Sequence, residues 1–488
     1  MTSIALISVP RTSISIPSPA IASLKSVAEE NKHKAFCIDL NIEIYREFEP
    51  REYQEIDNYF QLDLRYAHYK SLKLSDFKDD LSNTTYHAYK EFLDRWSTKI
   101  LELQSDFIGI SLLSVNSVIS CFDLCNELKN KCPTCKIILG GPGVSTDGIK
   151  ADANFGEFLI RHNLADYCIQ GEGEYKLLDL LNGVKSKEYK QIEDLDTLPF
   201  PDYDDLPVQD YDASNLISIT GSRGCVRNCS FCDIKSAWNQ YRYRSGKNIT
   251  QEIIHHYKKY NTTNIQFTDS LINGSLKSFG GFLDAMIESK SKKIIPDNLK
   301  WSGQFICRPK NQFREDWYKK MSEAGAGQLY IGIESASESV LHDMGKKLQF
   351  SDIEYMMEML YKYSIQCDIL LVIGYPTETR EDFEKTKEML RQFSKYNQEG
   401  VISGVNLGKT MVVLPGSPIG QNLNHWGIEY DSNQNWISNK NPDLTFKERL
   451  RRRIEIQKVC EDYGYIVRFP LTTLKTLKEN LLNNKETV

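Results

Sequence analysis

Three closely spaced cysteines near the middle of the chain restrict its architecture more than any other feature. Residues 219–232 read ITGSRGCVRNCSFC, so Cys225, Cys229 and Cys232 have the spacing C-x3-C-x2-C, and no fourth cysteine follows closely. Thiolates are the usual ligands of iron–sulfur clusters, and a four-iron cube needs four ligands. Three protein ligands leave one iron open, and an open coordination position is where a metal centre performs chemistry. We therefore predict that these cysteines are the metal ligands and the catalytic residues of a 4Fe-4S cluster.

Other interpretations of this cysteine motif fit less well. A zinc knuckle usually needs four Cys or His ligands in two close pairs, but the first histidines after the motif are His255 and His256, in a predicted helix. Disulfides are rare in the cytosol, where we expect this chain. A cluster that only transfers electrons normally has a fourth cysteine. The motif therefore favours a cluster with one open iron.

Length and composition indicate a globular protein with several domains. The 488 residues leave room for two or three domains, and 41% hydrophobic and 26% charged residues suit ordinary cores and a hydrated surface. The net charge of −6 implies no general attraction to nucleic acid. No apolar run approaches the length of about 18 residues that a membrane span needs, and residues 1–11 resemble a first strand more than a signal peptide. We expect a cytoplasmic protein that does not bind a membrane, and we do not expect nucleic acid as its partner.

Two further clusters of residues receive structural interpretations. The densest basic stretch, residues 447–453, is predicted to be one solvated face of a helix rather than a binding patch. Cys121 and Cys125 lie one helical turn apart, and Cys132 and Cys135 have C-x2-C spacing, which can hold a metal. We favour a structural role over a second metal site for these cysteines, with Cys121 and Cys125 as buried small apolar residues.

The first part of the chain alternates strand-like and helix-like segments. Short apolar segments at 4–9, 35–39, 107–113, 136–139 and 167–170 alternate with helical spacing, and residues 47–103 form a polar and aromatic insertion or cover. Such alternation predicts an α/β fold with a doubly wound, Rossmann-like parallel sheet over residues 1–190. Glycine-rich loops at 140–143 and 171–174 follow two of these strands, at the edge of the sheet where ligands bind. Residues 191–211 are expected to be a linker.

The second part, residues 212–420, is predicted to be a partial parallel barrel. Six strand-like segments each end in polar or glycine-rich residues, and these segments are 217–220, 264–267, 300–305, 328–333, 368–373 and 406–413. The carboxyl ends of barrel strands form the catalytic face. Residues 421–488 are expected to be a helical C-terminal extension, with helices at 446–463 and 470–482.

The cysteine motif, together with Arg223, Gly224 and Phe231, resembles the cluster motif of the radical S-adenosylmethionine (SAM) superfamily. The order of the strand with GGPG, the strand with GEGE, the segment 198–203 and the cysteine motif resembles the cobalamin-binding group of that superfamily, over roughly residues 1–420. The resemblance implies a cobalamin-binding-type Rossmann-like domain followed by a partial (β/α)6 TIM-like barrel. It also implies three cofactors, which are a 4Fe-4S cluster, SAM and cobalamin. In the superfamily the open iron holds the amine and carboxylate of SAM, and one electron cleaves SAM to methionine and a 5′-deoxyadenosyl radical.

The same resemblance assigns cofactor-binding roles to individual positions. Residues in three loops of the first domain match those that line the corrin, namely Ser111, Ser114, Asn116, Gly140, Gly141, Pro142, Gly171, Glu172 and Gly173. In the barrel the matches to SAM-contacting positions are Phe231 beside the adenine, Asp269 and Ser270 at the methionine amine, Glu334 and Ser335 at the ribose and carboxylate, Arg308 at a carboxylate, and Gly374 near the adenine. A packing aromatic, a structural salt bridge and a turn are the alternative roles of Phe231, Arg308 and Gly374.

Two departures from the family pattern stand out. Residues 39–44 read DLNIEI, so the loop that places a histidine under cobalt in many cobalamin domains has no histidine here, and we expect no histidine ligand from it. Residues 268–270 read TDS where the family usually has Gly-Gly-Glu. The first departure is shared by other members of the group, and the second weakens the role given to Asp269.

The resemblance predicts a cobalamin-dependent radical SAM enzyme, most often a methyltransferase acting on an unactivated carbon or phosphorus centre. The substrate is expected to be a small molecule or peptide, and the reducing partner a flavodoxin or ferredoxin. Two other enzymatic activities stay open, which are radical ring formation or rearrangement and methylthiotransfer. A non-catalytic cobalamin or redox sensor is the alternative from another class of function, but a sensor does not need Glu334, Ser335 and an open iron together.

Overall fold

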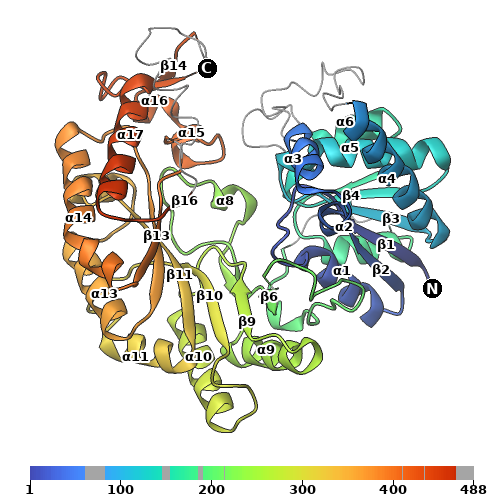
Figure 1. Cartoon of the computed structure of the whole chain (residues 1–488), viewed down its shortest axis with the longest axis horizontal. Coiled ribbons are helices and arrows are strands. Elements are labelled where there is room, and N and C mark those ends of the chain that lie inside the picture. Colours follow the sequence, from blue (N-terminus) through green and yellow to red (C-terminus); the bar gives the residue numbers. More distant parts are fainter. Residues whose placement is uncertain are drawn as a thin grey trace. The chain divides into compact units, whose positions relative to one another are not determined.

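The chain forms two compact units. The computed structural model describes residues 1–60, 83–144, 154–184, 191–213, 215–408, 410–432 and 435–468, so the helix expected at 470–482 lies outside the described residues. One unit comprises Met1–Ile219 with His255–Thr262, and the other comprises Thr220–Ile254 with Thr263–Val488 (Figure 1). Among the described residues, no helix is both long and apolar enough to cross a membrane.

The first unit contains the predicted doubly wound sheet. Five parallel strands are arranged in the order β2-β1-β3-β4-β5. They are β1 (Ser3–Ser8), β2 (Lys34–Asp39), β3 (Phe107–Ser111), β4 (Ile137–Gly140) and β5 (Tyr167–Ile169). The sheet grows to one side from β1 to β2 and to the other side from β3 onward. The carboxyl ends of β1 and β3 therefore lie at the topological switch point, which is the usual ligand crevice of such sheets.

Helices pack on both faces of this sheet. They are α1 (Pro19–Glu30), α2 (Leu40–Glu47), α3 (Pro50–Tyr59), α4 (Asn83–Glu102), α5 (Val118–Lys131), α6 (Phe155–Arg161) and α7 (Glu174–Leu181). Residues of β1 alternate between the two faces, so Ala5 and Ile7 belong to one core and Ile4 and Leu6 to the other. The predicted cover over 47–103 contributes α3 and α4, whose apolar side chains complete the first of these cores.

The segment expected to be a linker is packed onto the first unit. Tyr203 and Leu206 are buried in its second core. The hydroxyl of Tyr203 donates to the carbonyl of Ser218 at 2.9 Å, and Lys25 pairs with Asp205 at 2.8 Å. Residues 191–211 are therefore part of a folded unit, because apolar burial and an ion pair hold them there.

The second sheet has the strand succession predicted for a partial barrel. Its order is β16-β13-β12-β11-β10-β9-β6. The strands are β6 (Leu216–Ile219), β9 (Asn264–Phe267), β10 (Lys300–Phe305), β11 (Ala326–Glu334), β12 (Gln366–Leu371), β13 (Ile402–Asn406) and β16 (Val467–Arg468). The first six follow chain order, which confirms the fold class. The seventh, β16, comes from the expected C-terminal extension and pairs in parallel with β13.

Helices cover the outer face of this curved sheet (Figure 1). They are α9 (Gly246–Tyr260), α10 (Leu276–Ser291), α11 (Glu315–Ala324), α12 (Glu338–Asp343), α13 (Phe350–Lys362), α14 (Arg380–Gln398) and α17 (Phe446–Asp462). Trp301 of β10 lies 6.0 Å from Phe279 and 5.5 Å from Phe282 of α10, measured between ring centroids. Because side chains alternate along a strand, Ser302 and Gln304 face the opposite, inner side.

The basic run on α17 is not a solvated face, and that prediction was wrong. Arg449, Arg452 and Arg453 are all buried. Arg452 forms an ion pair of 3.1 Å with Glu378, and the two side chains are only 3% and 1% exposed. The guanidinium of Arg449 lies 3.6 Å from the ring centroid of Trp436, a cation–π contact. Arg452 thus attaches α17 to the loop that follows β12, and Arg453 attaches it to Gly408 after β13.

Removing the cation of the Arg452–Glu378 pair should destabilise the second unit. We expect Arg452→Met to lower the free energy of unfolding by about 3–5 kcal/mol, because it leaves a buried carboxylate without its partner. Urea unfolding followed by circular dichroism measures this change. The matched control is Arg451→Met, because Arg451 is 57% exposed and should contribute at most about 1 kcal/mol. Equal effects of the two substitutions would contradict the role of the buried pair.

Candidate metal centre

The loop that carries the three cysteines is closed at its base by a short hairpin. β7 (Ser222–Arg223) pairs antiparallel with β8 (Arg242–Tyr243). Between them, Gly224 has φ +85°, and a Cβ there would lie 2.8 Å from the carbonyl oxygen of Gln240. Only glycine takes this backbone conformation without strain. The loop therefore starts from a fixed point just beyond the carboxyl end of β6.

The three thiols lie near one another. Burial raises the pKa of each thiol, and the charge of a second cysteine of the set raises it further. Cys232 acts in this way on Cys225, Cys225 acts on Cys229, and Cys229 acts on Cys232. The backbone N–H of Arg227 donates to Cys225 Sγ at 3.3 Å, and that of Ile234 bonds Cys232. Hydrogen bonds of this kind tune iron–sulfur clusters. The thiol set therefore fits a cluster, whose binding would hold the three groups as thiolates.

The donor arrangement differs from that of a site for a single ion. Within the described ranges, no group of three or more His, Cys, Asp or Glu side chains is close enough to hold one metal ion. In a four-iron cube each cysteine binds a different iron, so the thiolates do not share one centre. The cysteine loop is therefore a candidate for a cluster rather than for a single metal ion.

Ser230, between the second and third cysteines, fastens the loop to the barrel. Its Oγ lies 2.8 Å from the hydroxyl of Tyr375, and its N–H donates to the carbonyl of Met344 at 3.1 Å. Its carbonyl accepts the N–H of Ile419 at 3.0 Å. These partners lie in the segments that follow β11, β12 and β13, so one residue joins the cysteine loop to three parts of the barrel. Sequence analysis missed Ser230, because nothing in the motif distinguishes this serine from a surface residue.

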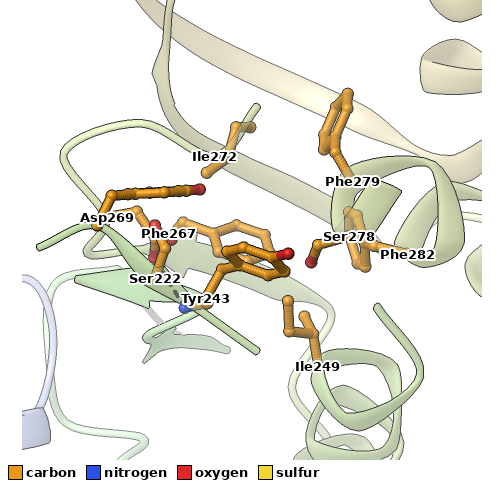
Figure 2. Close-up of a pocket in the computed structure, with 11 residues that line it drawn as sticks. Ser222, Tyr243, Ile249, Phe267, Asp269, Ile272, Ser278, Phe279 and Phe282 are labelled. Carbon is orange, nitrogen blue, oxygen red and sulfur yellow. Dashed lines mark hydrogen bonds between the residues drawn. The ribbon is translucent and has the colours of Figure 1, made fainter. Parts of the chain in front are cut away.

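Asp269 fastens the beginning of the same loop. Its carboxylate accepts the N–H of Gly221 at 2.8 Å and the hydroxyl of Ser222 at 2.5 Å. Figure 2 shows Asp269 and Ser222 together in a small pocket that Phe267 and Phe282 also line. Burial raises the pKa of Asp269 to about 7, against the opposing hydrogen bond from Ser222. Contact of Asp269 with a methionine amine stays a prediction, since the structure gives the carboxylate a supporting role. The neighbouring Ser270 is exposed.

A buried ion pair lies at the carboxyl end of β11. Glu334 has φ +69°, a left-handed conformation that is strained for a residue other than glycine and is common at functional sites. Its Oε1 lies 2.8 Å from Lys346 Nζ, which also donates to the carbonyl of Gly332 at 3.0 Å. Both charged side chains are buried. Burial alone would lower the pKa of Lys346, but Glu334 and the thiol of Cys229 outweigh it and raise the pKa. A charged lysine that sequence analysis missed therefore lies close to a cluster cysteine.

Two other predicted SAM-contacting residues bond to the protein itself. The hydroxyl of Ser335 is 3.3 Å from that of Thr386 on α14 and accepts the N–H of Ser337 at 3.1 Å. Arg308 donates to the carbonyls of Asn273 and Gly274, with its closest contacts at 2.7 Å. The structure thus uses Ser335 to join the end of β11 to α14, and it gives Arg308 hydrogen bonds to the loop after β9.

The remaining two predicted positions lie beside the apolar cluster at the strand ends. Phe231 packs against a group that includes Met344 and Tyr375. Gly374 has φ +81°, and a Cβ there would lie 2.7 Å from the side chain of Arg449. These contacts match the alternative roles of a packing aromatic and a turn, and a contact of either residue with adenine stays a prediction.

In the first unit, the loops after β3 and β4 pack against each other. Gly141 has φ +96°, and a Cβ there would lie 2.3 Å from the carbonyl oxygen of Leu112. A Cβ on Gly143 would lie 2.6 Å from the carbonyl oxygen of Ser114. These glycines are therefore required by loop packing, whereas among the described residues the nearest atom to a Cβ on Gly140 is 4.0 Å away. The open side of Gly140 and the 57% exposed Leu113 fit the flat, largely apolar face of a corrin.

Other predicted corrin-lining positions have mixed surroundings. Ser111 ends β3, and Ser114 Oγ accepts the N–H of the exposed Asn116 at 3.2 Å. Glu172 is buried and accepts the N–H of Ile192 at 2.6 Å, so its carboxylate holds the segment after α7. Three further positions belong to the loops themselves, Pro142 after β4 and Gly171 and Gly173 before α7.

The predicted absence of a histidine ligand has a structural counterpart. α2 begins directly after β2, and Asp39 caps it by accepting the N–H of Asn41 at 3.1 Å. The other oxygen of Asp39 accepts the hydroxyl of Tyr211 at 2.7 Å. A strand that turns at once into a capped helix leaves no loop from which a histidine side chain could extend.

Stability should depend on pH through Asp269. Its pKa in the folded protein, about 7, exceeds the ordinary value of about 4, so the folded protein binds a proton there that the unfolded chain releases between these pH values. The stability contributed by this proton is present below about pH 4 and is lost as the pH rises toward 7. We expect the difference in melting temperature between the wild type and Asp269→Asn to fall across this range. A difference that stays constant from pH 4 to 7 would contradict the raised pKa.

Comparisons with known proteins agree with this geometry. The family model of the radical SAM superfamily matches residues 219–390, which include the cysteine loop and the strand ends described above. An uncharacterized methyltransferase of Pyrococcus horikoshii is 26% identical over 313 residues, covering 59% of this chain and 64% of the relative. The anaerobic magnesium-protoporphyrin IX monomethyl ester cyclase of Cereibacter sphaeroides is 22% identical over 341 residues, covering 63% and 53%. The chain thus spans between half and two thirds of the length of these curated relatives.

A solved structure shows the same fold over the whole chain. The radical SAM methyltransferase TsrM from Kitasatospora setae, with cobalamin and a 4Fe-4S cluster bound, superposes with a TM-score of 0.62 over 99% of both chains at 13% sequence identity. At that identity the likeness concerns the fold. The family match thus identifies a radical SAM domain at residues 219–390, and the chain as a whole has the fold of this solved methyltransferase structure.

Proposed function

We propose that this protein is a cobalamin-dependent radical SAM methyltransferase. It would hold a 4Fe-4S cluster through Cys225, Cys229 and Cys232 and transfer a methyl group from SAM to an unactivated carbon or phosphorus of a small molecule or peptide. The convergence of the three thiols at the carboxyl end of the barrel carries this proposal, because it leaves one iron of a four-iron cube open to SAM. The expected electron donor is a flavodoxin or ferredoxin.

The Glu334–Lys346 pair is suited to hold the polar end of SAM. An ammonium group has three donors, and Lys346 uses two of them, on Glu334 Oε1 and on the carbonyl of Gly332. The third can bond the methionyl carboxylate beside the cluster, and a charge-assisted bond of this kind is strong. Glu334 Oε2 can accept from a ribose hydroxyl or from the amine. The pair would thereby orient SAM without introducing an unpaired charge.

A bound cluster supplies the electron that cleaves SAM, and a bound cobalamin supplies a carrier for the methyl group. The protein's own part is to orient these groups and to exclude water. The loops after β3 and β4, with Gly140 and Leu113 on their open side, would hold the corrin. Support for cobalamin comes from the fold shared with TsrM over the whole chain and from the fit of these loops.

Methyl transfer and the alternative activities leave different products. Methylation of an unactivated centre consumes two molecules of SAM, one that loses its methyl group and becomes S-adenosylhomocysteine and one that becomes methionine and 5′-deoxyadenosine. A ring-forming enzyme, as the cyclase of Cereibacter sphaeroides is named, needs no S-adenosylhomocysteine. The ratio of the two nucleosides therefore separates the proposed activity from ring formation.

Anaerobic reconstitution tests the proposal directly. After incubation with iron, sulfide and hydroxocobalamin and removal of free cofactor, we expect about one corrin per chain over a broad iron–sulfur absorbance. With a strong reductant and SAM, the protein should form 5′-deoxyadenosine and S-adenosylhomocysteine. Cys229→Ala should lose the cluster absorbance and 5′-deoxyadenosine formation and still retain corrin, because the first unit is unchanged.

The control for this experiment is Cys132→Ala, which removes a partly exposed cysteine outside the loop and should change none of these readouts. Undiminished 5′-deoxyadenosine in Cys229→Ala would exclude the proposed cluster ligand. A cluster without retained corrin would exclude cobalamin and move the function to another radical SAM reaction.

Lys346 should determine the affinity for SAM. Loss of a hydrogen bond to a charged group costs about 1.5–3 kcal/mol, so Lys346→Met is expected to raise the Kd for SAM by about 10–100-fold. Equilibrium dialysis of the reconstituted protein with labelled SAM measures the change. Lys346→Arg should recover part of the affinity, and the exposed neighbour Lys347 provides the control Lys347→Met. Wild-type affinity in Lys346→Met would show that the lysine only neutralises Glu334.

A further inference from the structure

The inner face of the barrel sheet carries a row of polar side chains. Gln304 of β10 is in register with Tyr330 of β11, and Tyr330 is in register with Asp368 of β12. Their neighbours Phe305 and Ile331 are buried in the opposite direction, toward the outer helices. Because side chains of adjacent strands in register lie close together, the three polar groups form one row across the inner face.

Arg468 of β16 joins this row by crossing a strand. Its Nε lies 2.8 Å from Asp368 Oδ2 and its Nη2 lies 3.2 Å from Asp368 Oδ1. The side chain passes over Gly404 of β13, where a Cβ would lie 2.6 Å from Arg468 Nε and 2.9 Å from Asp368 Oδ1. The absence of a side chain at Gly404 is therefore what allows the arginine to reach β12.

The carboxylate of Asp368 holds the guanidinium of Arg468 in one orientation. It is buried, and it also accepts hydrogen bonds from Gln328 Nε2 at 3.0 Å and from Ser403 Oγ at 3.0 Å. With four donors around its two oxygens, the carboxylate has little capacity left for a ligand. The fork of Arg468 is consequently fixed in direction, as a preorganised binding group should be.

Three donor groups in the row point to a ligand. The side chain of Arg468 is 42% exposed, and within the described part of the chain its Nη1 makes no hydrogen bond. The hydroxyl of Tyr330 and the side-chain amide of Gln304 are half-buried and also have no hydrogen-bond partner among the described residues. The attachment of β16 to the sheet accounts for the Arg468–Asp368 ion pair. It does not account for these three donor groups.

We propose that three side chains of this row, Gln304, Tyr330 and Arg468, bind a carboxylate of the substrate. A guanidinium presents donors that match the geometry of a carboxylate, and a phenol and an amide can donate to the same anion. One cation that is already paired with Asp368 suits a monoanion better than a phosphate dianion. This inference rests on the proposed function, because it assigns the substrate class of that site.

The row lies below the carboxyl ends of the strands, at a distance that suits a small substrate reacting near the cysteine loop. Arg468 is in register with Asn406, Asn406 with Leu370, and Leu370 with Gly332. Gly332 precedes Glu334 by two residues, which is roughly 7 Å along a strand. A carboxylate held by Arg468 would therefore leave the rest of a small molecule directed toward the strand ends where the cysteine loop is fastened.

Binding of matched acid and amide probes to the full chain tests the inference. In saturation-transfer NMR we expect phenylacetate to bind at least about 5-fold more tightly than phenylacetamide, because a charge-assisted hydrogen bond is about twice as strong as a neutral one. Tyr330→Phe should weaken phenylacetate binding by about 3–10-fold, the effect of one lost hydrogen bond. Its melting temperature should not change, since the hydroxyl has no partner in the described protein. Arg468→Gln should abolish the preference for the acid.

Several results would overturn the inference. They are equal binding of acid and amide, no detectable binding of phenylacetate, a preference for phenyl phosphate, or an unchanged acid preference in both variants. The matched control is Arg391→Gln, an arginine of α14 that pairs with Glu388 and should leave probe binding unchanged. The experiment needs neither cluster nor reductant. A protein that cleaves SAM but shows no acid preference would refute only this inference, and one that prefers the acid but does not cleave SAM would refute only the proposed function.

Discussion

The attachment of the cysteine loop to the strand ends is the constraint on which the rest of the site depends. The loop contains only one short helix, α8 (Ile234–Ala237), and an unfastened loop would lose conformational entropy whenever it gathered three thiols. Asp269 fixes its beginning and Ser230 fixes its middle. Since the partners of Ser230 follow three different strands, the barrel must be folded before the thiols have their final arrangement. The cluster site is therefore a property of the whole barrel rather than of the short motif.

Sequence patterns predicted the features that depend on neighbouring residues. The doubly wound sheet and the succession of barrel strands follow from alternation and from turn residues within windows of about ten positions, and the structure confirms both. The cysteine motif was equally local. Its spacing alone indicated a cluster with an open iron, and the family match over residues 219–390 agrees with that interpretation.

Features that depend on distant partners were not predicted. The arginine run on α17 was expected to be solvated because sequence alone does not show that Glu378, 74 residues away, neutralises Arg452 inside the protein. Ser230 was missed for the same reason, since its partners Met344, Tyr375 and Ile419 lie far along the chain. Lys346 was missed although its partner Glu334 is only 12 residues away, because its burial is not visible in the sequence. For Asp269 the residue was identified but its surroundings were not, because the bonds to Gly221 and Ser222 depend on how two loops meet.

Glycine is the residue whose meaning in the sequence was most ambiguous. A glycine at a strand end can admit a ligand, but the space beside Gly332 is filled by the Glu334–Lys346 pair, the space beside Gly374 by Arg449 and the space beside Gly404 by the Arg468–Asp368 pair. In each case a missing Cβ admits a charged side chain that would otherwise not fit against the sheet. Buried charges are tolerated only when they are paired or hydrogen-bonded, so these glycines make room for paired or hydrogen-bonded charges within the second unit. Gly141 and Gly143 serve loop packing in the same way, whereas at Gly140, the last residue of β4, no atom of the described residues comes closer than 4.0 Å to a Cβ position.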